Sequence, residues 1–495
     1  MSLFKTSDDV RLFTDVESDE FGLGFFHKKN KYVHHSPLHH SDTAYVNVTL
    51  AQGFFVSILV ITLLYATIIS WSITLLTVIA VLTFLYFADL LFNLFLIIRS
   101  FAKSPELKVT QEEINEYEKE HEWPTYTIFC PLYKEWQVVP QFVKAMTDLD
   151  YPTIKMQVML LLESDDEKTI EEVRKSKLPS NFSVVVVPHS LPKTKPKALN
   201  YGLRHATGEY VVIYDAEDVP EPLQLKKTVL AFSQVSKKTV CIQAKLNFYN
   251  PHQNILTKAF TAEYSLWFDL VLTGLQSINA PIPLGGTSNH FRKADLHTLK
   301  GWDSFNVTED CDLGIRLARH GFTTAIVDST TYEEANSDLG NWMNQRTRWI
   351  KGYIQTYFVH SRNPLKLLKG VKLLNYLSFQ IIVGGKVISM LINPIMWILT
   401  ILYFILRPIY GNFLEAFFPA PVLYMAVTCL FLGNFLYMYY YAIGCAKRGY
   451  FELVKYSIFT PLYWLAMSLS AYRAFLDFTY KPHFWHKTKH GLHIQ

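Results

Sequence analysis

Apolar residues are concentrated in long runs near the two ends of the chain, on either side of a segment patterned like an ordinary globular domain. Gly53 to Ile69 and Ile73 to Ile98 are nearly uninterrupted apolar runs, separated only by a Ser-Trp-Ser linker. At about 1.5 Å per residue, each run is long enough for a helix to cross a hydrocarbon core of roughly 30 Å. We therefore predict a transmembrane hairpin over residues 51–99, preceded by an N-terminal segment of residues 1–50.

Three further apolar runs follow the central domain, at 374–406, 421–441 and 456–478. Before them, residues 364–372 mix Leu and Lys at helical spacing, which favours a helix lying on the membrane surface. The run at 374–406 is long enough for a half-helix on the membrane surface plus one crossing. Pro461 can interrupt the helix predicted for the run at 456–478. We expect three or four crossings over residues 361–480, five or six in total, before a tail of residues 481–495.

Basic residues flank the first hairpin on both sides: Lys28, Lys29, Lys31, Arg99 and Lys103. The positive-inside rule then predicts that both ends of the hairpin, and the domain of residues 100–360, are cytosolic. The loop near 410–418 carries Glu415 and no Lys or Arg, whereas basic residues crowd the loop of 447–455. The sequence thus predicts a multi-pass protein of the plasma (inner) membrane. The side of the tail, with Lys481, Lys487 and Lys489, stays open.

Four ionisable residues lie in or at the ends of the apolar runs: Asp89, Lys386, Arg473 and Asp477. A charge facing lipid costs about 2.5 kcal/mol or more, so each faces either a polar conduit or the membrane surface. The N-terminal histidines His34, His35, His39 and His40 form no regular ligand spacing. A solvated loop is therefore favoured over a metal site.

Composition narrows the class of protein further. Half of the residues are apolar and 15% are aromatic, which is too apolar for a soluble enzyme. The net charge of +4 and the absence of a basic, aromatic-interleaved block argue against nucleic acid as a partner. The five cysteines form no CxxC pair, which fits a reducing cytosolic setting. No cleavable signal peptide is recognised at the N-terminus.

Within the central domain, continuous apolar runs alternate with helix-like stretches. Five of them read as strands buried on both faces, as in a parallel α/β sheet: 125–130, 156–163, 182–188, 210–218 and 239–246. Ligands bind beyond the carboxyl ends of such strands. Acidic and aromatic residues follow three of these runs, at 131–135, 163–166 and 215–218. One such strand end can be a helix cap, but three together predict a binding rim.

Asp215, Glu217 and Asp218 place three carboxylates within four residues. Their mutual repulsion favours a bound cation, and hard oxygen ligands suit Mg²⁺ or Mn²⁺. Such ions take their remaining ligands from phosphates and water. The sequence therefore predicts a metal-bridged diphosphate at this rim.

Four motifs occur in a characteristic order: an acidic segment at 163–167, DAED at 215–218, TED at 308–310 and QxxRW at 345–349. With them the chain resembles the processive, membrane-integrated family 2 glycosyltransferases, which include cellulose, hyaluronan and exopolysaccharide synthases. The resemblance covers about residues 120–360. It implies a cytosolic GT-A (Rossmann-like) α/β catalytic domain flanked by transmembrane helices.

The resemblance also implies roles on the donor side. Tyr133 and Glu135 would hold the nucleoside, together with one of Glu163, Asp165 and Asp166. Lys197 and Asn200 would lie beside the ribose and diphosphate, and Asp215 would contact the nucleotide. Glu217 and Asp218 would bind Mg²⁺ or Mn²⁺.

On the acceptor side, Asp310 is implied to be the general base, because a carboxylate can take the proton of an attacking hydroxyl. Arg348 suits the leaving diphosphate, Trp349 offers a flat face to the acceptor sugar, and Gln345 completes the motif. Gly286, Thr287, Thr308 and Glu309 are implied to lie near the acceptor.

Alternatives to these roles remain for three segments. The TED residues can cap a helix running to Arg319, with Asp312 and Arg316 paired at i, i+4. The segment 342–351 can be an interfacial anchor. The GGTSNHF segment at 285–291 can be a plain turn, and we predict a loop for it.

The implied function is inverting transfer of sugar, most simply hexose from UDP, to a growing β-linked polysaccharide at the cytosolic membrane face, with translocation of the product as a further hypothesis. The expected partners are a nucleotide-sugar, a polysaccharide acceptor and the lipid bilayer, with room for accessory export proteins. The main alternative is a non-processive enzyme acting on a lipid-linked acceptor. A non-catalytic nucleotide-sugar-binding scaffold is the alternative outside enzymes.

Overall fold

The computed structural model describes residues 38–410 and 419–488, together with 18–19, 22–27 and 30–33. Predictions that concern Lys28, Lys29, His34, His35, Glu415 and Lys489 lie outside the described residues. Near the N-terminus, a small antiparallel sheet is formed by β1 (Ser18–Asp19), β2 (Gly22–His27) and β3 (Asn30–Val33).

The central domain is built on an eight-stranded sheet with the order β6-β5-β4-β7-β10-β9-β11-β8. Its strands are β4 (Tyr126–Leu132), β5 (Met156–Glu163), β6 (Phe182–Val187), β7 (Tyr210–Ile213), β8 (Val219–Pro220), β9 (Thr239–Phe248), β10 (Asn289–Arg292) and β11 (Thr323–Glu333). Neighbouring residues along a strand enter opposite hydrophobic cores, Ile128 on one side and Phe129 on the other. Burial on both faces explains the continuous apolar runs.

All five predicted strands are present, but the sheet is mixed rather than parallel. Strands β4, β5, β6 and β7 pair in parallel, whereas β10 pairs antiparallel with both β7 and β9. The loop predicted for 285–291 is therefore wrong in its second half, because Asn289 begins β10. This strand is only four residues long and follows Gly285-Gly286-Thr287-Ser288. Because these preceding residues are typical of turns, the whole segment was predicted to be a loop.

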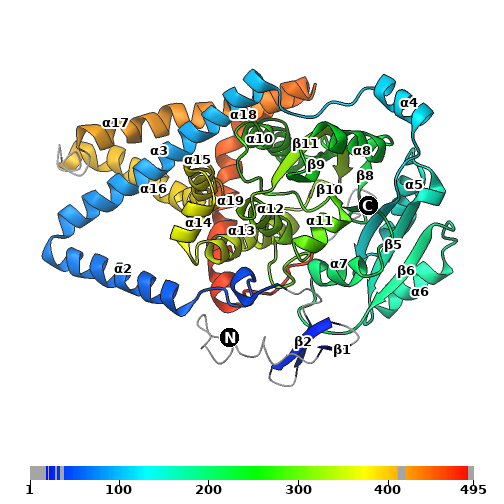
Figure 1. Cartoon of the computed structure of the whole chain (residues 1–495). Coiled ribbons are helices and arrows are strands. Elements are labelled where there is room, and N and C mark those ends of the chain that lie inside the picture. The colour runs from blue at the N-terminus through cyan, green and yellow to red at the C-terminus, as the bar shows by residue number, and fades with distance from the viewer. Residues whose placement is uncertain (1–17, 20–21, 28–29, 34–37, 411–418, 489–495) are drawn as a thin grey trace.

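Helices cover both faces of the sheet (Figure 1). They are α4 (Gln111–Glu120), α5 (Val139–Thr147), α6 (Glu167–Lys175), α7 (Lys195–Leu203), α8 (Gln224–Gln234), α9 (Ile255–Leu266), α10 (Leu272–Ser277), α11 (Lys293–Thr298), α12 (Glu309–Arg319) and α13 (Leu339–His360). Two of them matter most for the site: α12 begins within the TED motif, and α13 carries QxxRW.

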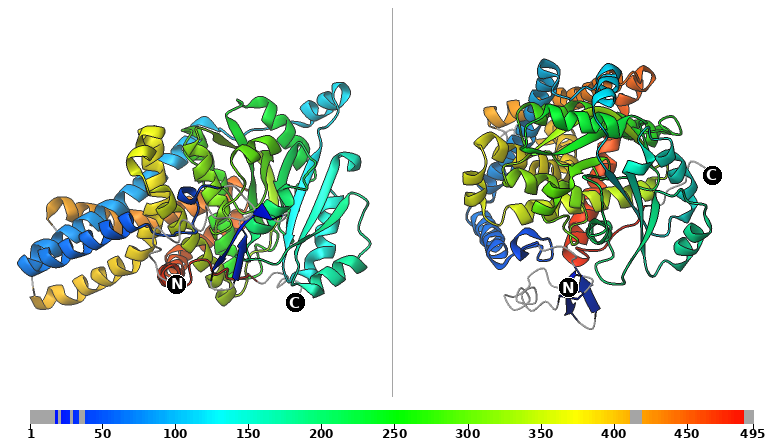
Figure 2. Two further views of the ribbon diagram at one scale, coloured as in Figure 1. Left: turned by 60° about the horizontal axis from the view of Figure 1, so that its bottom comes forward. Right: turned by 45° about the vertical axis from the view of Figure 1, so that its right-hand side comes forward.

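Long apolar helices extend from one side of this domain, as Figure 1 shows and Figure 2 repeats from two further directions. Within the described residues, four stretches are long and apolar enough to cross a membrane: α2 (Leu50–Ile69), α3 (Trp71–Lys103), Leu373–Ile409 and Ala420–Lys447. The third contains α15 (Leu373–Phe379) and α16 (Lys386–Tyr410), and the fourth contains α17 (Ala420–Thr428) and α18 (Asn434–Lys447). Large apolar side chains on α2, such as Ile68 at 84%, are exposed, which indicates membrane association.

Fewer candidate spans are therefore found than the five or six crossings predicted. The run at 456–478 becomes α19 (Thr460–Tyr480), which is not among the four. It carries Arg473 and Asp477 and packs lengthwise against α13 of the central domain. A helix, α14 (Pro364–Gly370), is present in the segment 364–372, and its location at a membrane surface stays a prediction.

Glycines bring the apolar helices into backbone contact with the central domain. A β-carbon at Gly274 of α10 would lie 2.4 Å from the carbonyl oxygen of Leu96 in α3. One at Gly444 of α18 would lie 2.7 Å from the backbone nitrogen of Leu266 in α9. Such distances leave room only for hydrogen, so these helices and the sheet domain are packed directly on one another.

Candidate active site

Two neighbouring cavities lie at the carboxyl ends of the parallel strands. The first, which we name the outer cavity, has a volume of about 560 Å³ and lies between the ends of β4 and β5 and the C-terminal segment. Tyr133, Glu135 and Glu163 line it on the strand side. Residues 481–488, which follow α19 and which we name the C-terminal wall, line it on the other side with all their side chains except that of His486, together with Tyr480 at the end of α19.

The second, which we name the inner cavity, has a volume of about 240 Å³. The predicted residues Gly286, Thr308, Glu309, Asp310, Gln345, Arg348 and Trp349 line it. It continues between the apolar helices, where Asn93 of α3, Lys386 of α16, Tyr437 of α18 and Trp464 of α19 line its far end. Lys386 therefore lines this cavity, and its ammonium group lies over the rings of Tyr437 and Trp464.

Five side chains line both cavities and so mark their junction: Lys195, Asp215, Glu217, Arg348 and Trp485. Two are acidic and two are basic. Lys195 donates to Asp215 and to the carbonyl oxygen of Gly286, the latter at 2.8 Å. Burial lowers the pKa of Lys195, but Asp215 and Glu309 outweigh this effect and leave its pKa above the ordinary value.

Asp310 lies in the first turn of α12, and its carboxylate accepts a hydrogen bond of 2.7 Å from the backbone N–H of Cys311. Burial raises its pKa, while Lys195 and Arg348 oppose the rise. The neighbouring Glu309 is buried as well, and burial together with the charge of Asp310 raises its pKa to about 8. The pKa of Glu309 is thus raised partly by the negative charge of its neighbour Asp310.

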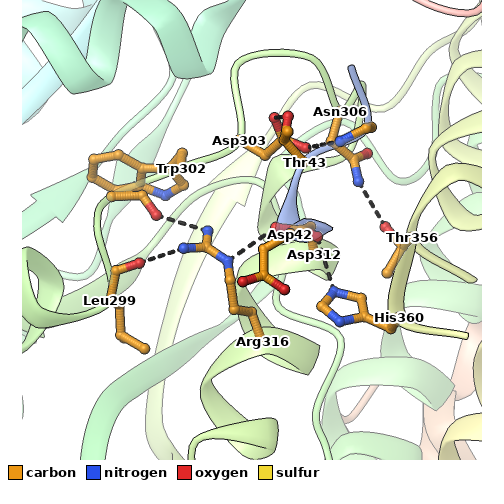
Figure 3. Close-up of polar contacts among 12 residues, drawn as sticks. Asp42, Thr43, Leu299, Trp302, Asp303, Asn306, Asp312, Arg316, Thr356 and His360 are labelled. Carbon is orange, nitrogen blue, oxygen red and sulfur yellow. Dashed lines mark hydrogen bonds and ion pairs between the residues drawn. The ribbon is translucent and has the colours of Figure 1, made fainter. Parts of the chain in front are cut away.

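A buried polar network behind α12 holds this helix to its neighbours (Figure 3). The carboxylate of Asp312 contacts Arg316 at 3.3 Å and the ring of His360, at the end of α13, at 2.9 Å. Arg316 also donates to the carbonyl oxygens of Leu299 and Gly301. The predicted i, i+4 pair is thus present, whereas Thr308 precedes the helix without capping it through its side chain.

Asp303 connects this network to the N-terminal segment. It accepts hydrogen bonds of 2.6 Å from both the hydroxyl of Thr43 and the backbone N–H of Ala44. Figure 3 shows Thr43 approaching Asp303 from a separate segment of the chain. Residues 43 and 44, far from the motifs in sequence, therefore contribute to the support of α12.

The named side chains of the QxxRW motif and Arg346 all line the inner cavity, but the two arginines have different partners. The Arg348 guanidinium lies over the ring of Trp485 at 4.4 Å, and its Nε has no hydrogen-bond partner among the described residues. Arg346 instead pairs with Glu263 and stacks on Trp349 at 4.7 Å. Gln345 accepts a hydrogen bond of 3.2 Å from Asn336. The anchor role considered for 342–351 does not account for this inward-facing arrangement.

The three carboxylates of Asp215, Glu217 and Asp218 have different surroundings. Glu217 lines both cavities, whereas Asp218 lies beneath them and accepts hydrogen bonds from the Asp215 backbone and Thr287. Its other oxygen, Oδ1, is buried without a partner among the described residues, and burial raises the pKa of Asp218 well above its ordinary range. No group of three or more His, Cys, Asp or Glu able to hold a metal is found in the described part of the chain.

These observations fit a divalent cation whose coordination shell is completed by oxygen atoms of the substrate. The carboxylate of Glu217 lines the junction, and together with the unpartnered Oδ1 of Asp218 it would offer oxygen ligands to such an ion. Mg²⁺ characteristically uses only one or two protein carboxylates and fills its other positions with phosphate oxygens and water. A site with fewer than three protein ligands is consistent with that chemistry.

The sequence did not decide which of Glu163, Asp165 and Asp166 would hold the nucleoside, and in the structure these three carboxylates have different surroundings. Glu163 lines the outer cavity. Asp165 pairs with Lys193, and Asp166 caps α6 by accepting from the N–H of Thr169. Glu163 is thus the one of the three that faces the cavity.

Lys197 and Asn200 do not reach either cavity. Lys197 is fully buried and pairs with Glu163 at 2.7 Å, while Asn200 bonds to the backbone of Trp302. Lys195, two residues earlier, lines both cavities instead. Two residues correspond to about 200° around a helix, so these lysines point in different directions, which the pattern KPK does not reveal.

Gly286 lies against the carboxylate of Asp310, because a β-carbon there would be 3.4 Å from Oδ2 of Asp310. Thr287 points away from the cavities, donating to the carbonyl oxygen of Ile213 and to Asp218. Of the two, only Gly286 is in position to approach an acceptor.

The C-terminal wall was not among the predicted site residues. Lys487 donates to the carbonyl oxygen of Tyr133 and lies 3.4 Å from the carboxylate of Glu135. Thr488 is buried, lines the outer cavity and has a hydroxyl without a partner among the described residues. The only sequence signal was a basic, aromatic tail, whose partner lies about 350 residues earlier in the chain.

Residues 124–352 match the profile of the family described as "Glycosyltransferase like family 2". The match begins two residues before β4 and ends in α13, so it contains the acidic trio, Asp310 and Arg348. Residues 124–352 thus match a family 2 glycosyltransferase domain, and their sheet with its covering helices is a GT-A-like α/β fold.

Two curated relatives give this class further detail. "Probable glycosyltransferase YdaM" of Bacillus subtilis (strain 168) is 26% identical over 234 residues, 47% of this chain and 56% of that protein. "Cellulose synthase 1 catalytic subunit [UDP-forming]" of Komagataeibacter xylinus is 28% identical over 266 residues, 52% of this chain and 34% of that protein. The chain thus matches only about a third to just over half of the length of these relatives.

Among solved structures, the mannosyltransferase PcManGT from Pyrobaculum calidifontis, in complex with GDP-Man and Mn²⁺, is similar with a TM-score of 0.45 and 16% identity. The superposition covers 81% of this chain and 98% of that one. A similarity of this size does not by itself define the fold, which rests on the sheet and the family match.

Proposed function

We propose that this protein is an inverting polysaccharide synthase that uses a nucleotide-sugar at the cytosolic membrane face and extends a β-linked chain. The observation that carries the proposal is the junction of the two cavities. There Arg348 and Glu217 line both the outer cavity, at the strand ends, and the inner cavity, which continues toward the apolar helices; Asp310 lines the inner cavity with them. Relatives named cellulose synthase support a polymer as the product.

In this proposal the outer cavity binds the nucleoside diphosphate. Tyr133 offers a ring to the base, and Glu135 and Glu163 offer acceptors to base and ribose hydroxyls. Lys193, Lys195, Arg348, Lys481 and Lys487 line the same cavity and supply the positive charge that a diphosphate requires. Glu217 and Asp218 would hold Mg²⁺ or Mn²⁺, which neutralises diphosphate charge when bound.

The chemical step is a single displacement at the anomeric carbon. Asp310 accepts the proton of the acceptor hydroxyl while that oxygen forms the new glycosidic bond. The bond from the anomeric carbon to the diphosphate breaks on the opposite face, which inverts the configuration. Arg348 stabilises the negative charge that develops on the departing diphosphate, and Trp349 holds the terminal sugar of the acceptor.

The helix-lined end of the inner cavity supports passage of the growing chain between the apolar helices. Asn93, Tyr437 and Trp464 offer the amide, hydroxyl and aromatic groups to which sugars bind. In this arrangement the sugar added last stays near Trp349 while older units lie deeper.

Purified protein reconstituted in vesicles, supplied with a panel of labelled nucleotide-sugars, tests the proposal. A long β-linked product that is protected from a glycosidase on the active-site side supports synthesis with translocation. A product with one added sugar on a lipid supports the non-processive alternative. Absence of transfer from every donor would refute the proposed function.

A further inference from the structure

The carboxamide of Gln355 in α13 joins three segments that are distant in sequence. Its Oε1 accepts a hydrogen bond of 3.0 Å from the backbone N–H of Val307. Its Nε2 donates to the carbonyl oxygen of Pro482 and to Oδ1 of Asn47, both at 3.0 Å. An N–H can only donate and a backbone carbonyl can only accept, so these partners fix the orientation of the amide.

One side of Gln355 leads to the catalytic base. Val307 is followed by Thr308, Glu309 and Asp310, so the bond to its N–H holds the turn that delivers the base. The next residue of α13, Thr356, bonds to Asn306 of the same turn at 3.0 Å. Both side chains are fully buried, where a lost hydrogen bond is not replaced by water.

The other side of Gln355 leads to the outer cavity. Pro482 belongs to the C-terminal wall, and Lys351 holds the same wall by donating to the carbonyl oxygens of Lys481 and Phe484 at 3.1 and 2.6 Å. Residues 351 and 355 are one helical turn apart and share a face of α13. Two buried side chains thus hold three carbonyl groups, at positions 481, 482 and 484, just before Trp485 and Lys487.

We propose that Gln355 is a positioning residue that sets the C-terminal wall and the Asp310 turn relative to each other. Gln355 lines neither cavity, so it acts through Val307 on one side and Pro482 on the other. This inference rests on the proposed function in taking the outer cavity as the donor site. It goes beyond that function by assigning one side chain to both donor binding and turnover.

Two substitutions separate the two sides. Gln355→Glu retains an oxygen for the Val307 N–H but loses both donated bonds, whereas Gln355→Met retains the shape and loses all three. In both variants, hydrogen exchange of amides in 481–488 should accelerate about fivefold or more, and the donor KM should rise by a similar factor. Only Gln355→Met should also accelerate exchange in 305–311 and lower kcat about fivefold.

Thr356→Val is the matched control, because it removes a buried hydrogen bond to Asn306 on the same helical turn without touching the C-terminal wall. It should lower kcat and leave the donor KM and the exchange of 481–488 unchanged. The proposal is overturned if Gln355→Glu leaves the wall as protected as in the unaltered protein, or if the three variants change KM and kcat alike. The exchange measurement needs no substrate, so it judges the role of Gln355 even if the proposed transfer activity fails.

Discussion

Gly352 of α13 lies so close to Thr308 that a β-carbon at position 352 would be 2.1 Å from the Thr308 Oγ1 atom. Because Thr308 immediately precedes Glu309 and Asp310, α13 and the TED turn can keep this spacing only with glycine at 352. Gly352→Ala should displace the turn and lower kcat at least tenfold, measured as sugar transfer in membranes. Gly340→Ala, at the start of the same helix, meets only a carboxylate oxygen at 3.3 Å and should retain most activity.

Asp310→Asn should lower the rate of transfer by about 10²–10⁴-fold, because the amide cannot accept the hydroxyl proton. Donor affinity, measured by titration with the nucleotide-sugar, should change little, since Asp310 does not line the outer cavity. A large loss of donor binding with the same substitution would instead indicate a role in holding the nucleotide.

The acidic pair predicts an unusual pH profile. Activity should fall at low pH as Asp310 takes up a proton, with a midpoint above the usual Asp value of about 3.9, because burial raises its pKa. Glu309, with a pKa of about 8, loses its proton above that pH and adds a second negative charge where the diphosphate charge develops. The rate should therefore fall again above pH 8.

Glu309→Gln tests the alkaline limb, because glutamine mimics the protonated carboxyl and cannot ionise. The fall above pH 8 should disappear in this variant, whatever its absolute rate, in a profile of kcat/KM from pH 5 to 9.5. Persistence of the fall would assign it to another group.

Lys487→Met should raise the donor KM about tenfold with little change in kcat, because Lys487 lines the outer cavity and lacks contact with the inner one. Lys455→Met, which removes an exposed lysine away from both cavities, is the control for loss of one positive charge. Equal effects of the two substitutions on KM would exclude a specific role of Lys487.

Removal of divalent cations with EDTA should abolish transfer, and added Mg²⁺ or Mn²⁺ should restore it. Glu217→Gln should raise the cation concentration needed for half-maximal activity, because it removes the accessible carboxylate at the junction. Full activity in EDTA would show that the basic side chains alone neutralise the diphosphate.

The strands of the catalytic domain and the start of α12 were readable from the sequence because local pattern determines them. Runs such as MQVMLLLE at 156–163 must be buried on both sides, and the TED residues stand directly before a helical pattern. Strands β10 and β11 were not predicted from the sequence. In the case of β10 the reason is that the strand has only four residues and comes shortly after two glycines.

Other features of the site depend on contacts that no local pattern contains. Lys195 and Lys197 are equivalent in the sequence, yet packing directs one into the cavities and the other toward Glu163. The C-terminal wall meets Tyr133 across 354 positions of sequence. Such pairings follow from the assembled fold, not from periodicity.

The backbone contacts at Gly274 and Gly444 leave no hinge between the catalytic domain and the apolar helices. Under the proposed function, the reaction centre would therefore keep a constant distance from these helices. Each added sugar would then have to push the older units forward, because the two parts of the enzyme could not swing against each other.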